Sequence, residues 1–135
     1  MIVDTSALLA FFDIAEPRHA DVVREIEATA ESLVVSPYVI AELDYLVLTR
    51  HGSQAELAVL AELASGAWEL ASMDAGRFEA ARRVVERYRD RPIGLADASN
   101  IVLADVYRTR TIATLDVRHF SVLRLQDGGS PLLVP

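Results

Sequence analysis

The stretch Met1-Ile2-Val3-Asp4-Thr5-Ser6 sets the fold expected for the whole chain. Three apolar residues, two of them β-branched, lead directly into an acid and two hydroxyls, which predicts a short buried strand with a carboxylate at its carboxyl end. Thr5 and Ser6 are good helix N-caps, and an apolar-rich segment follows them. In open parallel α/β sheets, ligand sites form just beyond the carboxyl ends of the strands. Asp4 therefore stands where chemistry is expected.

The composition indicates a single globular domain spanning residues 1–135. The hydrophobic fraction is 52%, yet no apolar run approaches the ~20 residues needed to cross a bilayer. The N-terminus lacks a basic region before an apolar stretch, so no signal peptide is expected. The chain has no cysteine, which excludes disulfides and thiolate-bound metals and fits a cytoplasmic location.

The net charge of −7 argues against a surface that attracts nucleic acid everywhere. The charge is unevenly spread, because residues 1–74 hold 13 acids and 3 arginines whereas residues 75–135 hold 7 acids and 10 arginines. All 13 cationic side chains are arginine. The absence of lysine excludes a P-loop and a Schiff-base enzyme, since both use one.

Strands and helices are expected to alternate after the first strand. Further helices are predicted over 17–31, 37–51, 53–65, 74–89 and 95–107, the fourth of these five ranges being rich in arginine. Further strands are predicted over 33–36, 68–71, 111–114 and 121–125, with a turn at 117–120 and an added edge strand within 131–135. Ser53 and Glu56 predict a capping box. This alternation indicates a three-layer α/β/α domain with a mainly parallel central sheet.

Four acids occupy conspicuous positions in this pattern. Asp4 ends the first strand, and Asp116 directly follows a later one. Asp97 lies in the first turn of a predicted helix. Glu42 lies inside a helix that is apolar nearly all round, where a charge is costly unless it is paired or bound to a metal.

Converging carboxylates predict a hard divalent cation. Mg²⁺ and Mn²⁺ prefer carboxylate and water ligands, and several neighbouring carboxylates cannot all stay ionised without a cation nearby. None of the three histidines stands in metal-ligand spacing with another, so an oxygen-ligated metal is favoured over zinc. Such a metal suits phosphodiester hydrolysis, because it activates a water molecule and neutralises phosphate charge.

Each acid also has a simpler interpretation when it is considered alone. Asp4 could cap a helix, and Asp97 could interact with the helix dipole. Glu42 could pair with an arginine, and Asp116 could belong to a turn. The set of four, rather than any one of them, favours a metal site.

Four motifs carry a resemblance to a known family. They are Ile2-Val3-Asp4-Thr5-Ser6-Ala7-Leu8, Ser36-Pro37 through Glu42, Gly94-Leu95-Ala96-Asp97-Ala98, and Thr114-Leu115-Asp116 through Phe120. In order and spacing the sequence resembles the PIN-domain ribonucleases, and specifically the VapC-type toxins of bacterial toxin–antitoxin pairs. The resemblance covers essentially the whole chain and implies a single PIN domain over residues 1–135.

The resemblance also implies roles for individual residues. It implies an acidic, metal-binding and catalytic pocket made of Asp4, Glu42, Asp97 and Asp116. In such a pocket Asp4 and Asp97 would bind Mg²⁺ directly, and the other two acids would act directly or through water. It further implies hydroxyls that orient the ligands or contact phosphate; these are Thr5, Ser6 and Thr114.

The function implied by the resemblance is that of a Mg²⁺-dependent endoribonuclease toxin. It would cut structured RNA, either tRNA or rRNA, and inhibit translation. The resemblance implies a homodimer and a cognate VapB-type antitoxin in a hetero-oligomer. Helices 37–51 and 53–65 agree with a partner site, since they carry more apolar residues than one sheet face can cover; a three-layer core is the alternative.

Two other functions stay open from the sequence. One is a non-catalytic protein-interaction module in which the apolar helices are the working surface and the acids are structural. The other is a DNA-directed metal nuclease with the same acidic pocket. The arginine-rich helix and the pair Arg108 and Arg110 offer local phosphate contacts, although a solvated helix face is the simpler interpretation of most of these arginines.

Overall fold

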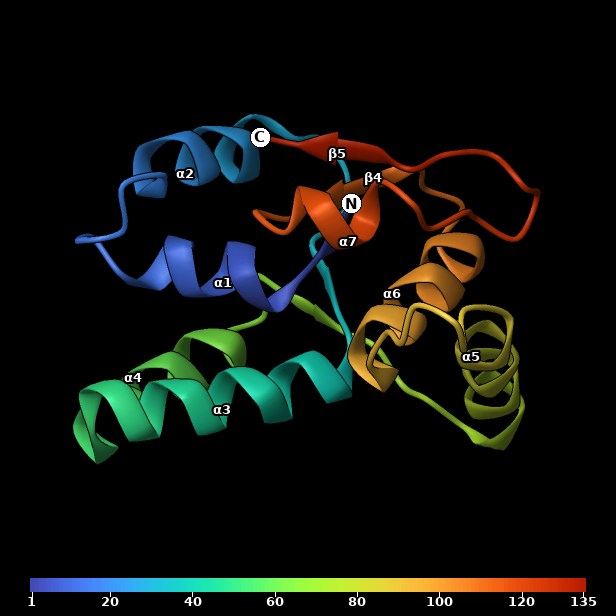
Figure 1. Ribbon diagram of the computed structural model, residues 1–135. Helices are drawn as coiled ribbons and strands as arrows, with labels where there is room; N and C mark the ends of the chain where they lie inside the picture. The colour runs from blue at the N-terminus through green and yellow to red at the C-terminus, as the bar shows by residue number, and fades with distance from the viewer.

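The computed structural model describes residues 1–135 and contains a five-stranded, all-parallel sheet (Figure 1). The strands are β1 (Ile2–Val3), β2 (Val34–Val35), β3 (Glu69–Leu70), β4 (Thr111–Ala113) and β5 (Leu132–Val134). Their order across the sheet is β3-β2-β1-β4-β5. The predicted strands at 33–36, 68–71 and 111–114 are therefore confirmed, and the edge strand within 131–135 as well.

Seven helices surround the sheet. They are α1 (Thr5–Phe12), α2 (His19–Ala28), α3 (Pro37–His51), α4 (Ser53–Leu63), α5 (Ala75–Arg87), α6 (Leu95–Val106) and α7 (Val117–Phe120). In Figure 1, α1 to α4 lie to the left and α5 and α6 to the right. None of the seven combines the length and apolar character that a bilayer crossing requires.

The two-residue alternation of the strands divides the core between the two faces of the sheet. Val3 and Val35 are buried among residues of α1 to α4. Ile2, Val34 and Ile112 are buried among residues of α5, α6 and the segment that follows α7. Both faces are thus covered, which confirms the predicted three-layer α/β/α architecture.

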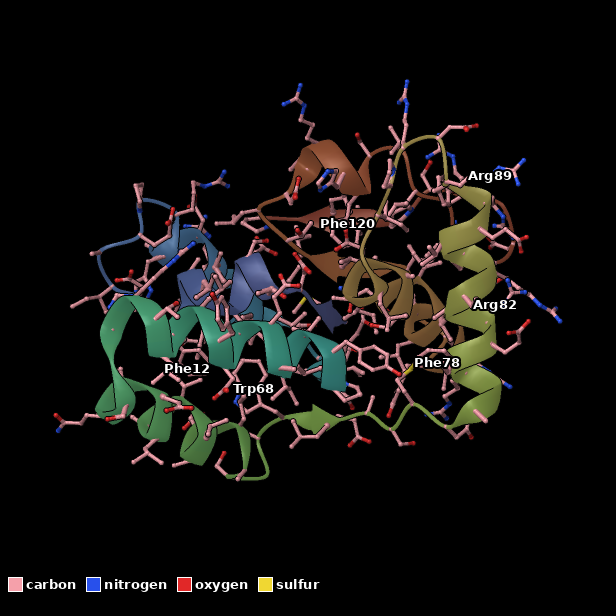
Figure 2. The ribbon with its side chains drawn as sticks, turned by 60° about the horizontal axis from the view of Figure 1, so that its bottom comes forward. Phe12, Trp68, Phe78, Arg82, Arg89 and Phe120 are labelled. Atoms are coloured by element: carbon pink, nitrogen blue, oxygen red, sulfur yellow. The ribbon has the colours of Figure 1, made fainter.

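Aromatic side chains fasten α1 to the segment that follows α4. Phe11 meets Trp68 edge to face with ring centroids 5.3 Å apart, and Phe12 lies 6.2 Å from the same indole. Figure 2 shows Phe12 and Trp68 together beneath α3. This packing fixes α1, and therefore the end of β1 from which it starts, against the α3–α4 pair.

Three local predictions are wrong. Residues 121–122 form a turn and residues 123–125 have no regular secondary structure, because β5 occupies the place beside β4 that a strand would need, although Leu123 and Leu125 are still buried. The capping box is absent, since α4 begins after Gly52 with no side-chain cap and Ser53 already lies inside the helix. The turn at 117–120 is a single helical turn, α7.

The strand order creates a crevice beside β1. The chain passes from β1 to β2 and β3 on one side of the sheet, and then returns to the other side for β4 and β5. Crossover connections diverge at such a switch point, and ligands bind outside the carboxyl ends of the strands there. Asp4 follows β1 and Thr114 follows β4 at this place.

Candidate active site

The four acids singled out in the sequence lie together. Asp4, Glu42, Asp97 and Asp116 line one cleft of about 330 Å³ at the carboxyl edge of the sheet. They come from the end of β1, the middle of α3, the first turn of α6 and the start of α7. Segments more than a hundred residues apart in the sequence thus contribute to one acidic surface.

Asp4 is the most firmly held of the four. It is 5% exposed and serves as the N-cap of α1, so the prediction of Thr5 or Ser6 as the cap is wrong and both lie inside the helix. Its Oδ2 accepts hydrogen bonds from Ser6 Oγ at 2.9 Å and Thr114 Oγ1 at 3.0 Å. Its Oδ1 accepts a hydrogen bond from Asn100 Nδ2 at 3.2 Å. These donors fix the orientation of the carboxylate while leaving it at the cleft wall.

The predicted hydroxyl residues divide into two groups. Ser6 Oγ also accepts a hydrogen bond from the Leu115 amide at 2.9 Å, and Thr114 Oγ1 accepts one from the Asp116 amide at 3.0 Å. These two side chains therefore join the ends of β1 and β4. Thr5 lines the cleft, but its buried hydroxyl oxygen has no hydrogen-bond partner.

Asp97 feels the charge of the other three acids. Burial raises its pKa, and the negative charge of Asp4 raises it further; Glu42 and Asp116 add smaller effects in the same direction, His119 opposes them, and the resulting pKa is about 6. No hydrogen bond offsets this repulsion. A positive charge placed in the cleft would relieve it.

The environments of Glu42 and Asp116 differ from the expectation. Glu42 is exposed on the outer face of α3, so the prediction of a buried charge that needs a partner is wrong, although Glu42 does line the cleft. Asp116 caps α7, because its Oδ1 accepts a hydrogen bond from the His119 amide at 3.1 Å. Its Oδ2 lies 2.7 Å from His119 Nδ1.

Two residues of the site escaped the sequence analysis. Asn100, fully buried, lies three residues after Asp97 on the same face of α6 and bonds to Asp4. His119, three residues after Asp116, lines the cleft as well. Each lies three residues after an acid, a spacing that places two side chains on the same face of a helix, and this spacing is the signal for them in the sequence.

The donor set fits a hard divalent cation by its chemistry. No three acidic or histidine side chains are already gathered in the spacing of a metal site. The cleft nevertheless offers only oxygen donors besides His119, and four carboxylates share it. Hard cations such as Mg²⁺ prefer oxygen donors of this kind.

Comparison with known proteins identifies the family. Residues 1–124 match the family model described as PIN domain, and the chain belongs to the PIN-domain family. A curated relative, Ribonuclease VapC26 of Mycobacterium tuberculosis (strain ATCC 25618 / H37Rv), is 64% identical over 135 residues and 100% of both chains. Within the family, the chain is a VapC-type ribonuclease toxin.

Solved structures support the fold. The crystal structure of Mycobacterium tuberculosis VapC20, a sarcin-ricin loop cleaving toxin, has a TM-score of 0.78 at 23% identity and covers 85% of this chain and 88% of its own. VapBC2 from Rickettsia felis, bound to a DNA fragment from its promoter, has a TM-score of 0.67 at 17% identity, with 89% and 90% covered. Both likenesses confirm the PIN-like architecture.

Proposed function

We propose that this chain is a Mg²⁺-dependent endoribonuclease toxin that hydrolyses phosphodiester bonds in structured RNA, with tRNA or rRNA as the target and inhibited translation as the outcome. The observation that carries the proposal is the meeting of four acids in one cleft, where their mutual repulsion helps to raise the pKa of Asp97 to about 6. Full-length similarity to a named ribonuclease supports RNA as the substrate.

The four acids have distinct proposed roles. Asp4 and Asp97 would hold Mg²⁺, or Mn²⁺ in its place, as direct ligands. Glu42 and Asp116 reach the cleft from more exposed positions and would act directly or through water. The bound cation would lower the pKa of a water molecule and offset charge on the phosphate.

The surrounding polar residues prepare the site for this chemistry. Ser6, Thr114 and Asn100 hold Asp4 in one orientation through three hydrogen bonds, so little ordering remains to be done when a ligand binds. Thr5 has a hydroxyl with no partner inside the protein. We assign to Thr5 the contact with a phosphate oxygen or an ordered water.

The α1–α4 side of the molecule provides the proposed partner surface. Ile14, Tyr45 and Leu57 are 85%, 66% and 66% exposed. Ile14 also lines a mainly apolar hollow with residues of α1, α3 and α4, and apolar patches on a surface mark protein interfaces. A cognate VapB-type antitoxin and a second copy of the chain are the proposed occupants. The structural neighbours include a toxin–antitoxin complex from Klebsiella pneumoniae and the VapBC2 complex, which supports this assignment.

A cleavage assay tests the enzymatic proposal. Purified protein is incubated with total tRNA and rRNA in Mg²⁺, in Mn²⁺ and in EDTA, and RNA ends are mapped by sequencing. We expect cleavage that requires the divalent ion and is lost in Asp4→Ala and Asp97→Asn. Asp90→Asn is the matched control, because it removes an exposed acid outside the cleft. Intact RNA in every condition would refute the proposal.

Two further measurements separate the alternatives. DNA with the sequence of a cleaved RNA should stay intact; equal cleavage would indicate a nuclease that does not select the sugar. Calorimetric titration with Mg²⁺ should show binding that Asp97→Asn weakens strongly and Asp90→Asn does not. Equal titration curves would favour the interaction module, in which the acids are structural.

A further inference from the structure

A second hollow adjoins the acidic cleft. It measures about 360 Å³ and is lined by Arg91, Pro92, Ile93, Arg118, His119 and Val122. His119 lines both the hollow and the acidic cleft. The hollow is formed by the segment that connects α5 to α6 and by α7 with the residues that follow it. We call it the Arg91–Arg118 hollow.

The two arginines of this hollow carry free charge. Arg91 and Arg118 are exposed, and neither forms an ion pair, in contrast to five other arginines of the chain. The nearest acid in sequence to Arg118 on α7 is Asp116, whose Oδ2 lies 2.7 Å from His119 Nδ1. Asp90 precedes Arg91 but is not among the lining residues.

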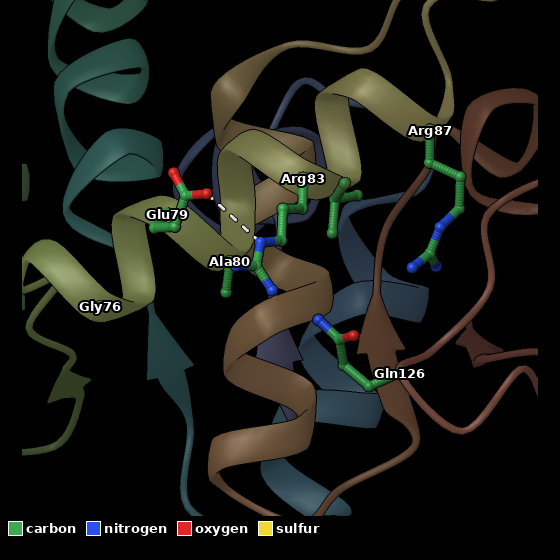
Figure 3. Close-up of a pocket in the computed structure, with 7 residues that line it drawn as sticks. Gly76, Glu79, Ala80, Arg83, Arg87 and Gln126 are labelled. Carbon is green, nitrogen blue, oxygen red and sulfur yellow. Dashed lines mark hydrogen bonds and ion pairs between the residues drawn. The ribbon is translucent and has the colours of Figure 1, made fainter.

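The hollow between α5 and the loop at Gln126 has a different character. It measures about 320 Å³, and its Arg83 forms an ion pair with Glu79 at 3.3 Å (Figure 3). Figure 2 shows that Arg82 on α5 and Arg89 just after it point to the outside of the molecule. Of the two hollows, only the Arg91–Arg118 hollow joins unpaired arginines to the acidic cleft.

We propose that the Arg91–Arg118 hollow binds the sugar–phosphate backbone of the RNA strand on one side of the bond that is cut. This inference rests on the proposed function, which places the reacting phosphate in the acidic cleft. A neighbouring phosphate would then meet Arg91 and Arg118. A guanidinium group can donate two parallel hydrogen bonds to the oxygens of one phosphate. The apolar side chains of Pro92, Ile93 and Val122 offer contact to ribose or base.

This arrangement explains how a protein of net charge −7 can hold a polyanion. Most of the surface repels RNA, so non-specific binding is weak. Arg91 and Arg118 place local positive charge at the mouth of the site, and phosphate contacts of this kind position a strand without reading its sequence. The strand is therefore directed to the cleft rather than spread over the surface.

The test measures RNA binding without relying on cleavage. A fluorescein-labelled single-stranded RNA is titrated with Asp97→Asn protein, which blocks the proposed chemistry, and anisotropy is followed over a series of salt concentrations. Arg91→Gln and Arg118→Gln are added singly and together. The control is Arg108→Asn. The sequence offered Arg108 as a phosphate contact, but it follows the C-terminal end of α6, opposite the end that carries Asp97, and lines neither the cleft nor the hollow. It is exposed and unpaired and has a φ of +53°, which asparagine tolerates.

Counterion release gives the expected size of the effect. Each lost phosphate contact on a single strand should flatten the plot of log K against log salt by about 0.7 and weaken binding about fivefold at 0.1 M salt. The double variant should therefore lose about 1.4 in slope and roughly 25-fold in affinity. Arg108→Asn should change neither quantity appreciably. Urea unfolding of each variant checks that the fold is retained.

Three results would overturn the inference. An unchanged salt slope in the double variant would show that the hollow makes no phosphate contact. If Arg108→Asn lost as much RNA affinity as Arg91→Gln or Arg118→Gln alone, only the overall charge of the protein would matter. Weakened binding of the cognate antitoxin with unchanged RNA binding would assign the hollow to an acidic protein segment. If RNA binding depends on the two arginines but wild-type protein does not cut RNA, the proposed function fails and the hollow remains a nucleic-acid site.

Discussion

The repulsion inside the acidic cleft should make Asp97 a destabilising residue at neutral pH in the absence of a divalent cation. We therefore expect Asp97→Asn to raise the free energy of unfolding. Asparagine keeps the volume of the side chain and removes the charge, and no hydrogen bond supports the carboxylate that it replaces. The variant that abolishes the proposed activity should thus be the more stable protein, as is common for residues at functional sites.

The magnitude follows from the pKa of Asp97. A rise from 3.8 to about 6 corresponds to about 3 kcal/mol at pH 7 if the whole shift counts. The side chain is only half-buried, so solvent screens its charge and we expect about half of this, ~1.5 kcal/mol. Because the folded-state pKa is raised, the penalty is absent below pH 3.8, grows as the pH rises and is complete above about pH 6.

Urea unfolding in EDTA between pH 4 and pH 7.5 measures the difference. Asp97→Asn should exceed wild type at pH 7.5 and converge with it at the acid end, whereas the control Asp90→Asn should follow wild type throughout. Adding Mg²⁺ should stabilise wild type and narrow the gap. A gap that is independent of pH, or an Asp97→Asn protein less stable than wild type at pH 7.5, would refute the electrostatic reasoning.

Three other substitutions test separate parts of the structure. Asn100→Ala removes the amide that bonds to Asp4 Oδ1, and calorimetry should show Mg²⁺ affinity about 10–100-fold lower; an unchanged affinity would rule out this positioning role. Phe120→Ala leaves a cavity where a fully buried side chain was, and urea unfolding should show a free energy of unfolding lower by about 3–5 kcal/mol. A decrease below about 1 kcal/mol would mean that the neighbouring side chains collapse into the cavity. Glu31→Gln weakens the carboxylate's contacts with the Met1 ammonium and the Thr109 hydroxyl, at a cost of about 0.5–1 kcal/mol at pH 7 because the site is partly exposed. Since these contacts lower the pKa of Glu31, the cost should shrink as the pH falls below 4.5, and a constant cost would contradict their ionic nature.

Local sequence was enough to predict most of the secondary structure. The Ser36 side chain accepts a hydrogen bond from the Tyr38 amide at the start of α3, and Pro37 follows at the first helical position, where proline is favoured. Asp74 caps α5 in the same way through the Arg77 amide. These features depend on residues a few positions apart, so they can be recognised without knowledge of the fold.

Burial was harder to predict, because apolar composition does not say which face meets a neighbour. Helix α3 is apolar nearly all round, yet Glu42 and Tyr45 are exposed on its outer face. Leu123 and Leu125 alternate as in a strand, but they belong to a loop. That loop packs against one face of the sheet and buries both side chains. In both cases the sequence pattern identifies the apolar residues but does not say which elements they pack against.

The sequence by itself determined most of the order of strands and helices along the chain, and it placed Asp4, Asp97 and Asp116 at element ends, because each of these features depends on residues close along the chain. Only the tertiary structure decided that Asn100 bonds to Asp4 across 96 residues, that Ser6 meets Thr114 across 108, and that unpaired arginines adjoin the acids. Such contacts depend on strand order and on how helices pack across the sheet. These are long-range choices, fixed by burial of the whole core rather than by any local segment.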